Sequence, residues 1–129
     1  GSEMCIRDSC DTGHNVAGWQ MLAPQIMAQP ARKRRLVFGM VDDKDLTHVM
    51  ELLPRDATYY WTQPSTHRAF PAEKVAECGR AHDLHGSLHP SVAEAYRAAL
   101  ADAAPDDFIF VGGSSYVVAD LLASLQEKP

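Results

Sequence analysis

Short apolar segments alternate with helix-like segments along nearly the whole chain, and this alternation is the strongest constraint on its fold. Leu36–Met40 and Phe108–Val111 are continuous apolar runs, typical of strands that are buried on both faces. Thr58–Thr62 is β-branched and aromatic, which favours a strand, and a weaker strand is expected over Gly86–His89. Strands joined by helices predict a mostly parallel, Rossmann-like sheet in a three-layer α/β/α sandwich.

Helix signals fill the segments between these strands. Apolar residues recur at helical spacing from Val16 to Met27, where Pro24 predicts a kink or a restart. Ser91 and Glu94 form a capping-box pattern, in which a serine side chain accepts a hydrogen bond from an amide one turn into the helix. The other helices are expected to run from about Lys44 to Leu53, from Pro71 toward Ala81, from Ser91 to Leu100, and through Val117 to Leu125.

The first nine residues do not look like a natural start. Gly1-Ser2 resembles the scar of a cleaved tag, and Met4–Ser9 (MCIRDS) resembles a translated sequencing-adapter artefact. We therefore expect residues 1–9 to be a tag scar and an artefactual leader. Residues 10–129 are expected to form one domain from a longer protein.

This replacement also affects the first strand. Ile6 is flanked by Arg7 and Asp8, and a central strand would not bury these charges without partners. The first strand is therefore expected to be short, frayed or shifted to an edge of the sheet.

Composition argues against several classes of protein. The net charge of −5 argues against a general nucleic-acid binder, and the one basic run, Arg32 to Arg35, is expected to cap a turn on a solvated face. The three cysteines (Cys5, Cys10 and Cys78) form no C-x-x-C pair, which fits a reducing compartment. No apolar run reaches membrane length and no signal peptide is visible, so a cytoplasmic protein is expected.

Two turns stand out where strands are expected to lead into helices, which is where parallel sheets bind ligands. Glycines in Gly112-Gly113-Ser114-Ser115 would let a phosphate or carboxylate approach the amides that begin the last helix, although a simple tight turn explains them equally well. In DTGHN (residues 11–15), Asp11 can accept hydrogen bonds from sugar hydroxyls, and His14 can donate to an oxyanion. Alone, this second motif is more simply explained by caps and a surface histidine.

Other candidate sites are weaker. His82, His85 and His89 could suggest zinc, but no cysteine stands beside them, and neutral loop histidines are commoner. We therefore assign no metal site. Cys10 is not followed by the arginine of a C-x5-R phosphatase loop, so a structural thiol is favoured. The sequence contains no G-x-x-x-x-G-K-[ST] loop, so this chain alone cannot perform P-loop phosphate chemistry.

Three ordered motifs carry a resemblance to a known family. DTGHN, then GMVDDKD (Gly39 to Asp45), then VGGSSYVVADLL (Val111 to Leu122) resembles the C-terminal domain of bacterial folylpolyglutamate synthase and dihydrofolate synthase, in the Mur ligase superfamily. The likeness covers nearly all of Cys10 to Leu125. Thr12-Gly13 stands where the family usually has Gly-Ala, which leaves the aspartate and the histidine in place.

The resemblance implies a reaction and its partners. In this family, ATP phosphorylates the carboxylate of a folate or dihydropteroate, and the amine of L-glutamate then attacks the acyl phosphate to form an amide. A preceding P-loop domain supplies the phosphate loop and the Mg²⁺ ligands. The C-terminal domain closes over that site as a lid that excludes water. The isolated chain is therefore expected to be inactive.

The resemblance also implies residue roles. Asp11 matches the aspartate that contacts the ATP ribose, and His14 matches the histidine, near glutamate and phosphate, that is the candidate catalytic residue. Ser114 matches a residue near the glutamate carboxylate. Arg68 stands where related Mur ligases place an amino-acid-binding arginine, although the surrounding PSTHR does not match their fuller motif. Asp43 and Lys44 match the family's D-K-D motif, whose role is left open between interface and structure.

Two alternatives remain open at this stage. The chain could come from another Mur-type amide ligase with a different acceptor, or it could be a non-catalytic nucleotide-binding α/β module. A preceding P-loop domain in the parent gene would exclude the second alternative. The pocket of that preceding domain would separate the first alternative from the folate ligase.

Overall fold

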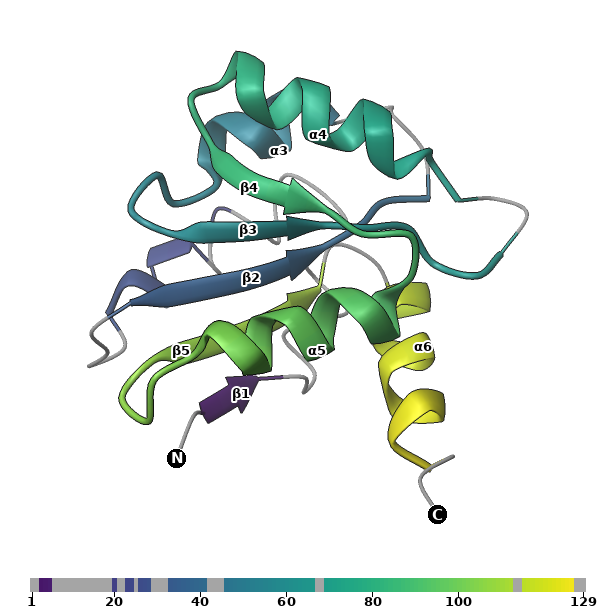
Figure 1. Cartoon of the computed structure of the whole chain (residues 1–129). Coiled ribbons are helices and arrows are strands. Elements are labelled where there is room, and N and C mark those ends of the chain that lie inside the picture. The colour runs from purple at the N-terminus through teal and green to yellow at the C-terminus, as the bar shows by residue number, and fades with distance from the viewer. Residues whose placement is uncertain are drawn as a thin grey trace.

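The computed structural model describes most of the chain, namely residues 3–5, 20, 23–24, 26–28, 33–41, 46–66, 69–112 and 115–126. Five parallel strands in these residues form one sheet in the order β1-β5-β2-β3-β4 (Figure 1). The strands are β1 (Glu3–Cys5), β2 (Arg34–Phe38), β3 (Thr58–Trp61), β4 (His85–Leu88) and β5 (Phe108–Gly112). The helices are α3 (Leu46–Leu52), α4 (Ala72–Ala81), α5 (Val92–Asp102) and α6 (Ser115–Gln126).

The helices cover both faces of the sheet, so the predicted three-layer α/β/α sandwich is confirmed (Figure 1). Helices α3 and α4 pack on one face, where Leu36, Phe38, Tyr59 and Trp61 point into the core. Helices α5 and α6 pack on the other face. There the core is formed by Val37, Tyr60, Ile109, Val111, Ala95, Ala99, Val117 and Leu121. Alternate strand residues point to opposite faces, which is why neighbours such as Tyr59 and Tyr60 belong to different core clusters.

The four predicted strands and the last four predicted helices are confirmed with boundary shifts of a few residues, whereas most of the helix expected from Val16 to Met27 lies outside the described residues. Strand β2 begins at Arg34 rather than Leu36, and β4 covers His85–Leu88, close to the weak strand expected there. The serine half of the capping box forms as predicted, because Ser91 Oγ accepts from the amide of Glu94 at 3.2 Å. The kink predicted at Pro24 stays a prediction, because several neighbouring positions are outside the described residues.

The first strand agrees with the expectation for a damaged start. Strand β1 has three residues and lies at the edge of the sheet, where it pairs only with β5 among the described strands. The domain boundary proposed at residue 10 remains a prediction.

The prediction for the basic run was wrong at Arg34 and Arg35. Both residues lie in β2 rather than in a turn, and Arg35 is 8% exposed. Arg35 Nε lies 3.0 Å from Asp107 Oδ2, and its Nη1 donates to the Tyr60 hydroxyl at 3.0 Å. A charged side chain tolerates burial when it is paired in this way. The run of basic residues gives no sign of a partner so distant in the sequence.

None of the helices in the described residues combines the length and the apolar character that crossing a bilayer requires.

Candidate ligand site at the carboxyl edge of the sheet

The order of the strands predicts a crevice between the carboxyl ends of β2 and β5. These two strands are neighbours in the sheet, yet β2 leads to α3 on one face and β5 leads to α6 on the other. Where the connections from adjacent parallel strands leave to opposite faces, the chain cannot fill the space between the strand ends. The topology therefore predicts the ligand site at the β2–β5 junction.

Backbone atoms of two of the three family motifs meet at this junction. The amide of Gly39, which begins GMVDDKD, donates to the carbonyl of Gly112 in VGGSS at 3.3 Å. A Cβ at Gly39 would lie 2.9 Å from the carbonyl oxygen of Thr62 and 3.1 Å from a Val117 methyl. A glycine is therefore needed where β2, the end of β3 and the first turn of α6 come together.

The loop from β3 to α4 leaves the same edge of the sheet, and its described residues are held at several points. The Thr62 amide donates to Phe38 O at 2.9 Å, and the Phe70 amide donates to Met40 O at 2.9 Å, so both ends of the loop are fixed to the segment that leaves β2. Between these anchors, Ser65 donates from its amide and its hydroxyl to the Asp120 carboxylate, at 2.6 and 2.8 Å.

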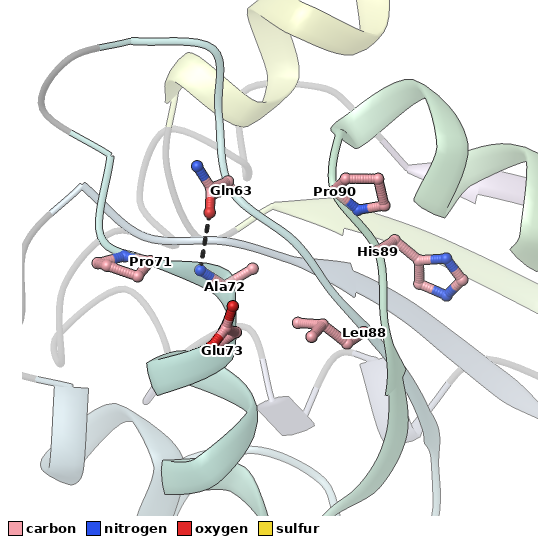
Figure 2. A pocket seen from close by; sticks show the side chains of 7 residues that line it. All are labelled: Gln63, Pro71, Ala72, Glu73, Leu88, His89 and Pro90. Carbon is pink, nitrogen blue, oxygen red and sulfur yellow. Dashed lines mark hydrogen bonds between the residues drawn. The ribbon is translucent and has the colours of Figure 1, made fainter.

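A shallow cavity of about 370 Å³ lies farther along the same edge, between β4 and the start of α4 (Figure 2). Gln63 Oε1 accepts from the Ala72 amide at 3.0 Å and so caps the first turn of α4. Figure 2 shows the His89 ring pointing away from Pro71 and Glu73. The polar groups around this cavity do not converge on one point, so the β2–β5 crevice is the stronger candidate site.

All six residues predicted for the site lie outside the described residues: Asp11, His14, Asp43, Lys44, Arg68 and Ser114. Their roles therefore stay predictions. Described residues that flank four of them do lie at the carboxyl edge, namely Val41 before Asp43 and Lys44, Thr66 and Ala69 around Arg68, and Gly112 and Ser115 around Ser114.

The three histidines considered for zinc are placed apart by the fold. His82 Nδ1 lies 2.9 Å from the carbonyl of Cys78 at the end of α4, and His89 Nε2 lies 2.7 Å from Ser87 Oγ. His85 begins β4. Within the described ranges, no three His, Cys, Asp or Glu side chains group as metal ligands. Burial raises the pKa of the Cys78 thiol, which disfavours the reactive thiolate.

Sequence reasoning missed Gln63, Ser65 and Asp120. Each is a common surface residue type, and none belongs to a recognisable motif. The one available signal was that Asp120 is the only charged residue in α6, which is otherwise formed from apolar and small polar side chains.

A parallel three-layer sandwich whose adjacent strands β2 and β5 end in glycine-containing segments defines an α/β domain of the doubly wound class. Residues 6–115 match the family model for the Mur ligase glutamate ligase domain, and the chain belongs to this family.

Comparison with individual proteins gives closer likenesses. The chain is 32% identical over 120 residues to the dihydrofolate synthase/folylpolyglutamate synthase of Escherichia coli K12, a match that covers 92% of this chain and 28% of that enzyme. Among solved structures, Escherichia coli FolC in complex with DHPP and ADP matches with a TM-score of 0.77 and 30% identity, over 88% of this chain and 27% of that one. A bifunctional folylpolyglutamate synthase/dihydrofolate synthase with Mn, AMPPNP and L-glutamate bound matches with a TM-score of 0.76, 30% identity and the same coverage. The chain thus spans little more than a quarter of the relatives it matches.

Proposed function

We propose that this chain is the C-terminal domain of an ATP-dependent ligase that joins L-glutamate to the carboxylate of a folate or dihydropteroate through an acyl phosphate. The observation that carries the proposal is the meeting of two of the three family motifs at the carboxyl ends of β2 and β5, through the Gly39–Gly112 hydrogen bond. The names of the relatives support the same reaction, since they include a folate synthase and complexes with ADP or L-glutamate.

The crevice suits one half of a two-domain active site. Helix α6 begins just after β5, and the start of a helix favours an anion, which is the chemistry needed for the carboxylates of glutamate. We assign Ser114 and Arg68 to that carboxylate, and Asp11 to the ribose of ATP. His14 is assigned to the region where the amine attacks the acyl phosphate. Asp43 and Lys44 are assigned to this edge without a defined role.

Among the described residues, no three metal-ligating side chains come together. We infer that the metal ligands and the phosphate loop come from a preceding P-loop domain, which the length of the relatives supports. ATP, Mg²⁺, L-glutamate and the folate acceptor would then meet between the two domains, and closure would exclude water from the acyl phosphate.

A fusion tests this proposal. Residues 10–129 would replace the matching C-terminal part of the Escherichia coli enzyme, and ADP release would be measured with dihydropteroate and L-glutamate. The Escherichia coli part without a C-terminal domain serves as the control. We expect ADP release that depends on L-glutamate from the fusion, and no ATP turnover from the 129-residue chain alone.

Two results would contradict the proposal. Turnover with another amino acid in place of L-glutamate would favour a different Mur-type amide ligase. ATP hydrolysis by the pure 129-residue chain, above a mock preparation, would show an independent enzyme.

A further inference from the structure

Helix α6 carries a single charged side chain, and that side chain binds a distant loop. Both carboxylate oxygens of Asp120 accept from Ser65, Oδ2 from the amide at 2.6 Å and Oδ1 from the hydroxyl at 2.8 Å. The two residues are 55 positions apart. Two hydrogen bonds to one ionised carboxylate fix both the distance and the direction of the contact, as a single bond would not.

The position of this contact relates it to the crevice. Ser65 lies in the loop after β3, whereas Asp120 lies in the helix after β5, and β2 separates these two strands in the sheet. The contact therefore joins the elements on either side of β2 at its carboxyl end. A Cβ at Gly39 would contact both Thr62 O and Val117, so the start of the loop and the first turn of α6 also lie close together just after β2.

Global stability does not explain the contact well. Ser65 is exposed, and both bonds to Asp120 lie at the surface, where charged contacts add little to the free energy of unfolding. The ends of the loop are already fixed by the Thr62 and Phe70 amides. The contact instead holds the middle of the loop, around Ser65, near the carboxyl ends of the strands.

We propose that Ser65 and Asp120 are positioning residues, a clasp that holds the β3–α4 loop against α6 and thereby sets the affinity of the β2–β5 crevice for its acidic co-substrate. The link to L-glutamate rests on the proposed function. The positioning of the loop rests on the two hydrogen bonds alone. Neither residue needs to touch the substrate.

Graded variants test the loop first, in the 129-residue chain. Asp120→Ala removes both bonds, and Ser65→Ala leaves only the bond from the residue 65 amide. Asp120→Asn removes the charge, although its side-chain amide can still bond to both groups of Ser65. Asp106→Ala removes an exposed carboxylate in the turn before β5 and is the matched control. We expect the Ala69 amide, which donates to Thr66 O at 3.0 Å, to exchange hydrogen about tenfold faster in Asp120→Ala and less so in Ser65→Ala and Asp120→Asn. Exchange at Val37 in β2 should not change.

The same variants in the fused ligase test the functional part. We expect Asp120→Ala to raise the KM for L-glutamate about tenfold while kcat stays within about twofold, because a displaced loop weakens binding more than chemistry. If the Ala69 amide exchanges in Asp120→Ala at the wild-type rate, the proposal that the Ser65–Asp120 contact positions the loop is wrong. Faster exchange with an unchanged KM would show a purely structural contact and overturn its role in affinity. A wild-type fusion without glutamate-dependent activity would count against the proposed function, and the exchange result would still decide the clasp.

Discussion

Arg35 and Asp107 lie 72 positions apart in the sequence and form a buried ion pair in the fold, with Nε 3.0 Å from Oδ2. Asp107 Oδ2 also accepts from the Ala104 amide at 3.0 Å, so the pair ties β2 to the turn that leads into β5. Tyr60 extends the network, because its hydroxyl accepts from Arg35 and donates to Asp102 Oδ2 at 2.9 Å. One network thus connects two central strands and the end of α5.

Breaking this ion pair should destabilise the fold strongly. Arg35→Ala leaves Asp107 buried without its cation, and we expect the free energy of unfolding to fall by about 3–5 kcal/mol in urea denaturation. The double variant with Asp107→Ala should lose less than the sum of the single variants, because it removes both charges. Arg97→Ala, an exposed arginine on α5, is the control and should change stability by less than about 0.5 kcal/mol. A loss of less than about 0.5 kcal/mol in Arg35→Ala would show that the Arg35–Asp107 pair adds nothing measurable to the free energy of unfolding.

Stability should also fall at alkaline pH through Tyr60. Burial raises the pKa of Tyr60 from 10.0 to about 12, and the hydrogen bond to Asp102 acts in the same direction. Because the folded state holds the proton more tightly, this contribution is complete below about pH 10 and is lost as the pH rises toward 12.

The variant Tyr60→Phe checks this. It should be less stable than the wild type at pH 8, since the bonds to Arg35 and Asp102 are lost, and should lose less additional stability between pH 9 and pH 11. Burial also raises the pKa of Tyr59, so part of the alkaline loss should remain. Tyr116→Phe on exposed Tyr116 is the control. Parallel pH profiles for Tyr60→Phe and the wild type would contradict the assignment.

Gly79 in α4 should not tolerate a side chain, although alanine normally favours a helix by about 1 kcal/mol over glycine. A Cβ there would lie 2.5 Å from the Trp61 ring, which stacks on Tyr59 at 4.6 Å and meets Phe38 edge-on, so the ring cannot move away freely. We expect Gly79→Ala to lower the free energy of unfolding by about 1–3 kcal/mol. Adding Trp61→Phe to Gly79→Ala should recover part of that loss relative to Trp61→Phe alone. A Gly79→Ala protein more stable than wild type would show that the Trp61 ring can move aside at little cost in free energy.

The predicted site residues should separate by kinetic signature in the fused ligase. Asp11→Ala should mainly raise the KM for ATP, and Ser114→Ala should raise the KM for L-glutamate about tenfold to a hundredfold, the effect of a hydrogen bond worth about 1.5–3 kcal/mol. His14→Ala should lower kcat more than it raises either KM, because it acts on charge that develops during amine attack. Each variant needs its melting temperature beside its steady-state constants. A folded His14→Ala enzyme with wild-type kinetics would remove this histidine from the mechanism.

Local patterns were enough to predict the layers of the fold. The apolar run at Phe108–Val111 became β5, and Ser91 caps α5, because both features depend on neighbours in the sequence. The contacts of Arg35 could not be predicted in this way, since a basic residue in a basic run is more often solvated than paired. The order of the strands, which places the crevice, depends on packing between distant segments and also needed the structure.

Only the site residues that belong to recognisable motifs could be predicted from the sequence. The GGSS turn and the DTGHN stretch were both predicted at one edge of the sheet; Gly112 lies at that edge, and the places of Asp11 and Ser114 stay predictions. Ser65 and Asp120 could not be predicted in this way, because a serine in a loop and an aspartate in a helix are both common and belong to no motif. Their relationship exists only once β3 and β5 lie on either side of β2.

The position of β5 has a consequence for how this domain forms during synthesis. Strands β2, β3 and β4 can associate in the order in which they leave the ribosome, but β5, the last of the described strands, must then pair beside β2. Until β5 is inserted, β2 presents an open edge, a state prone to association between nascent chains. Chains stalled on the ribosome before residue 108 should therefore be protease-sensitive, and released full-length chains should be protected.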